Sequence, residues 1–104
     1  QAQFVNTPIS TFPPMREDIA VVVDESVSAA TLEKTIRQAG GQLLTDARLF
    51  DIFRGEKLGL GKKSMAYQLT YQAYDRTLTD KDAETIRKRV IRALERELGA
   101  VLRS

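Results

Sequence analysis

The chain has 104 residues, the size of one domain, so one hydrophobic core is expected and two are not. Apolar residues make up 42% of it and charged residues 29%, a balance typical of a globular domain in water. It contains neither Cys nor His, which excludes disulfides, Cys/His zinc sites, thiol nucleophiles and imidazole bases. A binding module is the first expectation, although carboxylates and lysines leave acid–base or Mg²⁺ chemistry open.

The charge is uneven along the chain. Residues 1–52 hold four Lys/Arg against seven Asp/Glu, whereas residues 53–104 hold twelve against seven, for a net charge of +2. A basic C-terminal half suits contact with a polyanion, and it equally suits a solvated helix face. No stretch approaches the roughly 18 apolar residues of a membrane span, and no N-terminal signal is recognisable. We expect a soluble, cytoplasmic protein and, since the chain starts at Gln1, a processed or excised piece of a longer one.

The first half of the chain predicts a linker, a strand and a helix. Residues 1–10 are polar and contain a proline, which is typical of a linker preceding a domain over residues 11–104. Residues 19–23 form a β-branched run whose length favours a buried strand. Apolar residues recur at helical spacing over residues 28–39, and Gly40-Gly41 supplies the stop.

A hairpin is predicted next. Residues 43–53 and 64–71 have the character of two strands, joined by a glycine-rich loop over residues 55–61. On the second of them the apolar residues alternate toward the core, which leaves a flat polar surface on the other side. The members of that surface are Ser64, Ala66, Gln68 and Thr70.

Thr79 and Asp82 have the spacing of a capping box, so a helix is expected from there to Gly99. A short strand over residues 100–103 would complete the order β-α-β-β-α-β. This order predicts an α+β, ferredoxin-like split βαβ fold, with a four-stranded antiparallel sheet and two helices on one face. The other face would be uncovered, and RNA-binding modules of this topology use such a face.

The strand over residues 43–53 has an ambiguous register. The charge of Asp51 argues that it points outward, whereas Arg48 fits the same register poorly unless a bulge or the strand end frees it. The side chains then expected to point outward are Leu49, Asp51 and Phe53, and those expected in the core are Phe50 and Ile52. An outward Phe53 would offer a stacking platform for single-stranded RNA, unless the segment around Phe12 covers it.

Residues 55–64 end in Gly61-Lys62-Lys63-Ser64, which superficially resembles a phosphate-binding loop. Five residues rather than four separate Gly55 from Gly61, Lys63 stands at the Ser/Thr position, and the segment joins two strands. We therefore exclude a nucleotide site there and interpret the segment as a hairpin tip whose two lysines could meet phosphate.

The helix that begins near Thr79 carries two charged groups with competing interpretations. The carboxylates at its start are Asp80, Asp82 and Glu84. They favour the helix dipole and cap free N–H groups, an interpretation preferred over a metal site. The cations further along are Arg89, Arg92 and Arg96, with Glu95 and Glu97 as expected partners. Helical spacing would let these cations follow a phosphate backbone, but a solvated outer face is the preferred interpretation.

Four blocks of the sequence together resemble one family. They are FPPMREDIAVVV (12–23), RLFDIFRG (48–55), GKKSMAY (61–67) and DRTLTD (75–80). In this order they are similar to the ferredoxin-fold anticodon-binding domain, the C-terminal domain of the bacterial phenylalanyl-tRNA synthetase beta subunit. One position departs from that family, which usually has Arg directly before the Asp of the first block. Here that place is Glu17, with Arg16 one residue earlier as the candidate substitute.

The resemblance implies a tRNA-binding module that holds the anticodon stem-loop of phenylalanine tRNA while aminoacylation takes place elsewhere in the enzyme. It implies no catalytic residue, metal or cofactor in this domain, and ATP and Mg²⁺ for the whole enzyme. The expected partners are this RNA, the other domains of the beta subunit and the alpha subunit. The fragment alone is expected to be monomeric.

The expected RNA-binding surface joins the open sheet face to the hairpin. Its residues are Arg16, Asp18, Arg48, Asp51, Phe53, Arg54, Lys62, Lys63, Ser64, Ala66 and Gln68. Phe53 would stack on a base, and Asp51 and Gln68 would read base edges. The cations would hold phosphate, chiefly the hairpin cations Arg54, Lys62 and Lys63.

Two other functions remain open from the residues. One is a regulatory sensor of similar topology that binds a free amino acid, since this architecture hosts several functions. The other is a mainly structural domain that docks within the synthetase.

Overall fold

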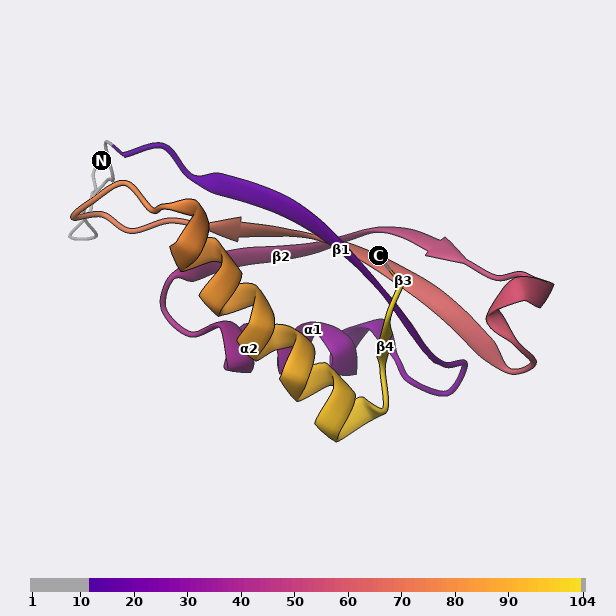
Figure 1. The fold of residues 1–104 in the computed structure, drawn as a ribbon. Coiled ribbons are helices and arrows are strands. Elements are labelled where there is room, and N and C mark those ends of the chain that lie inside the picture. The colour runs from indigo at the N-terminus through magenta and orange to yellow at the C-terminus, as the bar shows by residue number, and fades with distance from the viewer. Residues whose placement is uncertain (1–11, 104) are drawn as a thin grey trace, which may run out of the picture.

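The computed structural model describes residues 12–103, and the expected linker over residues 1–10 lies outside the described residues. Figure 1 shows two helices on one side of a twisted sheet. The elements in chain order are β1 (Met15–Asp24), α1 (Ala29–Gly40), β2 (Leu44–Phe53), the 3-10 turn η1 (Glu56–Leu58), β3 (Lys62–Tyr71), α2 (Asp80–Leu98) and β4 (Val101–Leu102). The predicted β-α-β-β-α-β order is confirmed.

The sheet has the strand order β2-β3-β1-β4, with every neighbouring pair antiparallel. β3 lies at its centre, and its alternate apolar residues are buried against the helices as predicted. The core is completed by one apolar stripe from each helix. Its fully buried members include Met65, Tyr67, Leu69 and Tyr71 of β3, Leu32 and Ile36 of α1, and Ile86, Val90 and Leu94 of α2.

The helix boundaries follow from their end residues. Ser28 accepts a hydrogen bond from the Thr31 N–H and begins α1. Thr79 and Asp82 form the predicted capping box, in which each side chain accepts a hydrogen bond from the other residue's backbone N–H. Gly41 and Gly99 follow the two helices with φ of 73° and 64°, values that favour glycine.

β1 is longer than the predicted strand over residues 19–23. It begins at Met15 because its whole length pairs with β3, from Met15 opposite Tyr71 to Asp24 opposite Lys62. The β-branched run marked only the part that is buried. The loop between β2 and β3 also contains the short turn η1, within the segment predicted as loop.

The predicted register of β2 is wrong at its centre. Arg48 lies opposite Gln68, and Asp51 lies opposite Ala66, with an irregularity between Leu49 and Asp51. This β-bulge inserts one residue, so Arg48 and Asp51 both share the face of Gln68 and Ala66. Leu49 instead packs against the core, whereas Phe50, expected in the core, is 54% exposed.

Ile52 points to the predicted side of the sheet, but the expectation that it is buried in the core is wrong. It lies opposite the buried Met65, so it points to the helix side, as expected. Even so, it is 42% exposed and lies outside the core cluster. β2 is the edge strand of the sheet, and its end leads into the hairpin tip, beyond the cover that the helices give.

Candidate functional site

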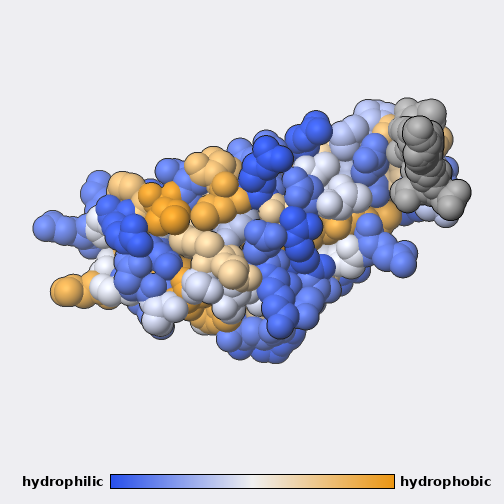
Figure 2. All heavy atoms as spheres, turned by 180° about the vertical axis from the view of Figure 1, so that it is seen from behind, coloured by the Kyte–Doolittle hydropathy of each residue, from blue (hydrophilic) through white to orange (hydrophobic). Residues whose placement is uncertain are grey.

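The candidate site lies on the face of the sheet that the helices leave uncovered, called the open face below. Residues opposite one another in the register point to the same face, so they form rows across β1, β3 and β2. The rows are Arg16–Thr70–Asp46, Asp18–Gln68–Arg48, Ala20–Ala66–Asp51 and Val22–Ser64–Phe53. Figure 2 shows the molecule from behind, with apolar residues gathered in the half that carries the hairpin tip. The prediction that Asp51 and Phe53 point outward is confirmed.

Phe53 lies under a residue from the C-terminal end of the chain. The Arg103 guanidinium lies 4.9 Å from the centroid of the Phe53 ring, within the range of a cation–π contact. Its Nη1 donates to Ser64 Oγ at 3.3 Å, and its backbone N–H donates to the Ala20 carbonyl at 2.7 Å. Phe53 keeps 43% of its surface exposed, so it can still take a stacking partner.

Phe12, the described residue of the segment expected to cover Phe53, lies elsewhere. The Phe12 carbonyl accepts a hydrogen bond from Gln72 Nε2 at 2.8 Å, just past the end of β3. Ser64, which is opposite Phe53, lies near the other end of that strand. Sequence reasoning missed Arg103 because the only signal was its position in the chain, next to a strand of two residues.

The middle of the open face is flat and carries a carboxylate. Ala20 and Ala66 have side chains of one carbon, and Asp51 lies beside them at the edge. Within residues 12–103 the Asp51 side chain has neither an ion pair nor a hydrogen bond, so its oxygens are free to accept hydrogen bonds from a ligand.

The other end of the open face carries a second aromatic ring, that of Phe50. With Asp18, Arg48 and Gln68 it lines a hollow of about 160 Å³. Sequence reasoning placed three of these residues on the surface and missed the aromatic one. The signal was the conflict at Arg48, which a bulge or the strand end could resolve.

The three hairpin cations form ion pairs with carboxylates of the same chain. Arg54 donates to both oxygens of Glu25, at 2.6 and 2.7 Å, and Lys63 Nζ lies 3.6 Å from Glu25 Oε2. Lys62 Nζ lies 2.6 Å from Asp24 Oδ1. The hydrogen bonds from Arg54 are the largest cause that lowers the pKa of Glu25 to about 2. These pairs tie the hairpin tip to the turn after β1.

Lys63 also points away from the open face. It precedes Ser64 on β3 and shares the helix side with Met65, where its side chain is only 9% exposed. The prediction that placed it beside Ser64 on one surface is therefore wrong, because successive strand residues alternate between faces. Phosphate binding by Arg54 and Lys62 stays a prediction.

Besides Arg103, two cations on the open face lack a close ion pair within the described residues. Arg16 makes no ion pair within residues 12–103. Arg48 Nη2 lies 4.0 Å from Asp46, and the Arg48 side chain is 76% exposed. Both are available to a phosphate group.

Glu17, which replaces the expected family Arg, points to the helix side. Arg87 Nη1 donates to both of its carboxylate oxygens, the nearer at 2.8 Å, and the Tyr71 hydroxyl donates to it at 2.6 Å. Burial, together with the hydrogen bond to Glu17, raises the pKa of Tyr71. Arg16 lies on the opposite face of β1, so it is not equivalent in position to residue 17, and its role as a substitute stays a prediction.

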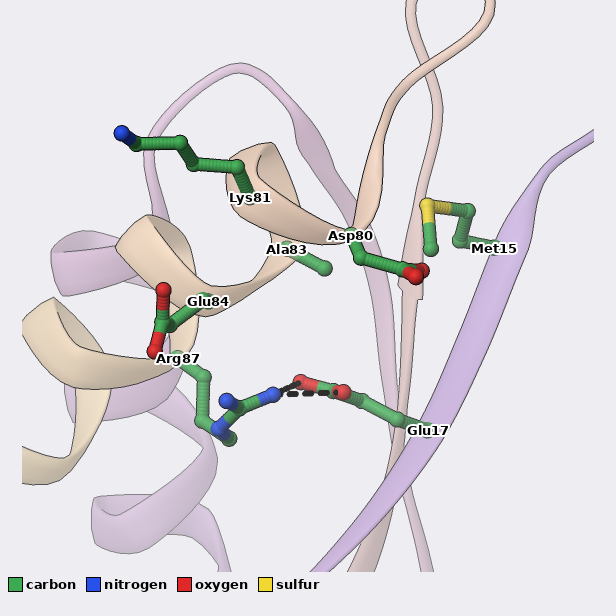
Figure 3. Close-up of a pocket in the computed structure, with 7 residues that line it drawn as sticks. All are labelled: Met15, Glu17, Asp80, Lys81, Ala83, Glu84 and Arg87. Carbon is green, nitrogen blue, oxygen red and sulfur yellow. Dashed lines mark hydrogen bonds and ion pairs between the residues drawn. The ribbon is translucent and has the colours of Figure 1, made fainter.

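A larger hollow, of about 470 Å³, lies beside this ion pair at the start of α2 (Figure 3). Figure 3 shows the Arg87 and Glu17 side chains pointing toward one another across it. Because these two charges satisfy each other, the hollow offers no unpaired buried charge to a ligand. Its lining residues are Met15, Glu17, Asp80, Lys81, Ala83, Glu84 and Arg87.

Two of the three carboxylates at the start of α2 interact within the helix, since Glu84 lies 3.5 Å from Lys88 Nζ and Asp82 caps the first turn. Asp82 is used by the capping box, and its hydrogen bonds from Thr79 lower its pKa. In the described part of the chain no group of three or more Asp or Glu side chains could hold a metal ion. Nor does any helix within residues 12–103 have the length and hydrophobicity needed to cross a membrane.

The three α2 arginines expected on a solvated outer face lie in three different environments. Arg96 pairs with Glu97 at 3.1 Å, as predicted. Arg89 instead donates to the Ala39 and Gly40 carbonyls at the end of α1, at 3.0 and 2.7 Å. Arg92 makes no hydrogen bond or ion pair within residues 12–103.

Comparison with known proteins identifies the fold family. Residues 10–103 match the ferredoxin-fold anticodon-binding domain. The chain is 50% identical over 102 residues to the phenylalanine–tRNA ligase beta subunit of Symbiobacterium thermophilum, and 47% identical over 96 residues to that of Geobacillus kaustophilus. These alignments cover 98% and 92% of this chain but only 11% and 12% of the relatives. The chain therefore belongs to the ferredoxin-fold anticodon-binding domain family, in the form found in phenylalanine–tRNA ligase beta subunits.

Proposed function

We propose that this domain binds the anticodon stem-loop of phenylalanine tRNA through its open face. The observation that carries the proposal is the row arrangement of that face, where Phe53 and Asp51 flank a flat floor of small residues. Proteins recognise single-stranded RNA loops by stacking splayed bases on aromatic rings and by hydrogen bonds to base edges. Phe53 is the stacking ring, and Asp51 and Gln68 are the edge-reading groups.

Phosphate contacts would come from cations that the chain leaves free. Arg16 and Arg48 on the open face meet this condition better than the hairpin cations, which are paired with Asp24 and Glu25. With so few phosphate contacts, the domain would contribute weakly to affinity by itself. It would act within a synthetase, beside the other beta-subunit domains and the alpha subunit, where ATP and Mg²⁺ serve the reaction.

The test compares aminoacylation by the whole synthetase with and without residues 11–104. An anticodon-binding role predicts chiefly a raised KM for tRNA, with kcat much less affected. Loss of subunit assembly would contradict this role and point to structural docking. Calorimetry adds a second arm: saturable binding of free phenylalanine without RNA binding would favour an amino-acid sensor.

A further inference from the structure

Phe50 is a large apolar side chain that the fold turns outward. The bulge between Leu49 and Asp51 gives β2 one extra residue, and Phe50 is that residue. Its ring is 54% exposed and lines the small hollow on the open face. A bulge of this kind re-aims a side chain, and such bulges are common beside functional sites.

The groups around this ring differ in their hydrogen-bonding chemistry. Asp18, Gln68 and Arg48 are direct neighbours across three strands. A carboxylate only accepts, an amide both donates and accepts, and a guanidinium donates and carries positive charge. Within residues 12–103 the side chains of Asp18 and Gln68 make no hydrogen bond or ion pair, and Arg48 has only its 4.0 Å contact to Asp46. The donors and acceptors of these three side chains are therefore available to a ligand.

We propose that Phe50, Asp18, Gln68 and Arg48 form a second nucleotide subsite, which stacks a second unpaired base of the RNA whose first base stacks on Phe53. Phe50 supplies the stacking face, Asp18 and Gln68 contact the edge of the base, and Arg48 contacts a phosphate. This inference rests on the proposed function and adds a binding position to it.

The spacing of the two rings determines the shape of the bound RNA. Phe50 and Phe53 are three residues apart along a strand that contains one bulged residue, which places them roughly 7–10 Å apart. Stacked neighbouring bases lie only about 3.4 Å apart. The two bases must therefore be splayed apart, with Asp51 and the Ala20–Ala66 floor between them.

The test uses the intact synthetase and a synthetic anticodon stem-loop of phenylalanine tRNA, with the base removed at one loop position at a time. Phe50→Leu keeps an apolar side chain but removes the ring, and we expect about 5- to 100-fold weaker binding of the unmodified stem-loop. Removing one particular base should then cost nothing further in Phe50→Leu. In Phe53→Leu, removal of a different base should cost nothing further. Phe50→Trp should retain binding because it keeps a stacking face.

The matched control is Tyr74→Leu, which removes a ring that is 69% exposed outside the paired strands. It should bind like the wild type. Unchanged binding by Phe50→Leu, or a dependence on the same base as Phe53, would overturn the second subsite while leaving the proposed function standing. If the wild type does not bind the stem-loop, or if Phe53→Leu has no effect, the proposed function itself is contradicted.

Discussion

The guanidinium of Arg103 lies over the ring of Phe53, 4.9 Å from its centroid, and so joins the C-terminal segment to the far edge strand of the sheet. The backbone of Arg103 lies beside β1, where its N–H donates to the Ala20 carbonyl. Its side chain extends across β3 and donates to Ser64. One arginine thus spans the row Val22–Ser64–Phe53 and borders the flat floor of the open face. It also places a positive charge beside the ring proposed to hold a base.

This contact is expected to stabilise the fold measurably. In a double-mutant cycle, Arg103→Ala and Phe53→Leu should couple by about 0.5–1 kcal/mol in the free energy of unfolding, the value of a cation–π contact at a partly exposed site. Urea denaturation of the four proteins measures the coupling. Strictly additive effects of the two substitutions would show that the guanidinium and the ring do not stabilise each other.

Substituting a cation on the open face and substituting the buried hairpin lysine should have different effects on the salt dependence of RNA binding. Arg48→Ala should weaken binding of the anticodon stem-loop, and the slope of log K against log salt should fall by about 0.7 for a lost single-strand phosphate contact. Lys63→Met is the comparison, because that lysine is 9% exposed and faces the helices. Binding titrations at several salt concentrations measure both slopes. A larger slope change for Lys63→Met than for Arg48→Ala would contradict the assignment.

The pair between Glu25 and Arg54 should make stability depend on acid pH. The Arg54 guanidinium lowers the pKa of Glu25 from 4.5 to about 2 in the folded state. Its stabilisation is therefore fully present above about pH 4.5 and is lost as the pH falls toward 2. The advantage of the wild type over Glu25→Gln in unfolding free energy should shrink over that range.

Urea denaturation at several values between pH 7 and pH 2.5 measures this dependence. Arg54→Met removes the main partner of the Glu25 carboxylate. The difference in unfolding free energy between Arg54→Met and the double variant Arg54→Met/Glu25→Gln should therefore change much less with pH. A constant difference between the wild type and Glu25→Gln across the range would mean that the ion pair makes no contribution.

Most of the fold followed from local sequence signals. The capping box at Thr79, the helical spacing and the alternation over residues 64–71 each depend on neighbours within a few positions, so one sequence suffices to find them. The register of β2 did not follow along its whole length, because a bulge interrupts the alternation of side chains between the two faces. The register inferred from Asp51 holds for Asp51 and Phe53 after the bulge and fails for Leu49 before it. The conflict between Arg48 and Asp51 indicated the bulge without locating it, and Phe50 was misplaced as a result.

The site was harder to predict, because its key contacts join residues distant in the chain. Glu25 and Arg54 are 29 residues apart, and Ser64 and Arg103 are 39 apart. Charge counts identify a basic hairpin but cannot reveal that nearby carboxylates pair with its cations. For the same reason, the Arg87 partner of Glu17 had no signal in the sequence other than its charge.

Two arginines of α2 offer a direct test of this distinction between local and long-range contacts. Arg89 donates to the Ala39 and Gly40 carbonyls, which lie at the end of α1 and lack helical partners. Arg89→Ala should cost about 1 kcal/mol in the free energy of unfolding, since it removes two charge-assisted hydrogen bonds and a cation at a helix C-terminus. Arg92→Ala, on the same helix, should stay within about 0.5 kcal/mol of the wild type, because Arg92 makes no such bond within residues 12–103. Urea denaturation of both variants decides the matter, and equal losses would place the stabilisation in α2 itself instead of in its contact with α1.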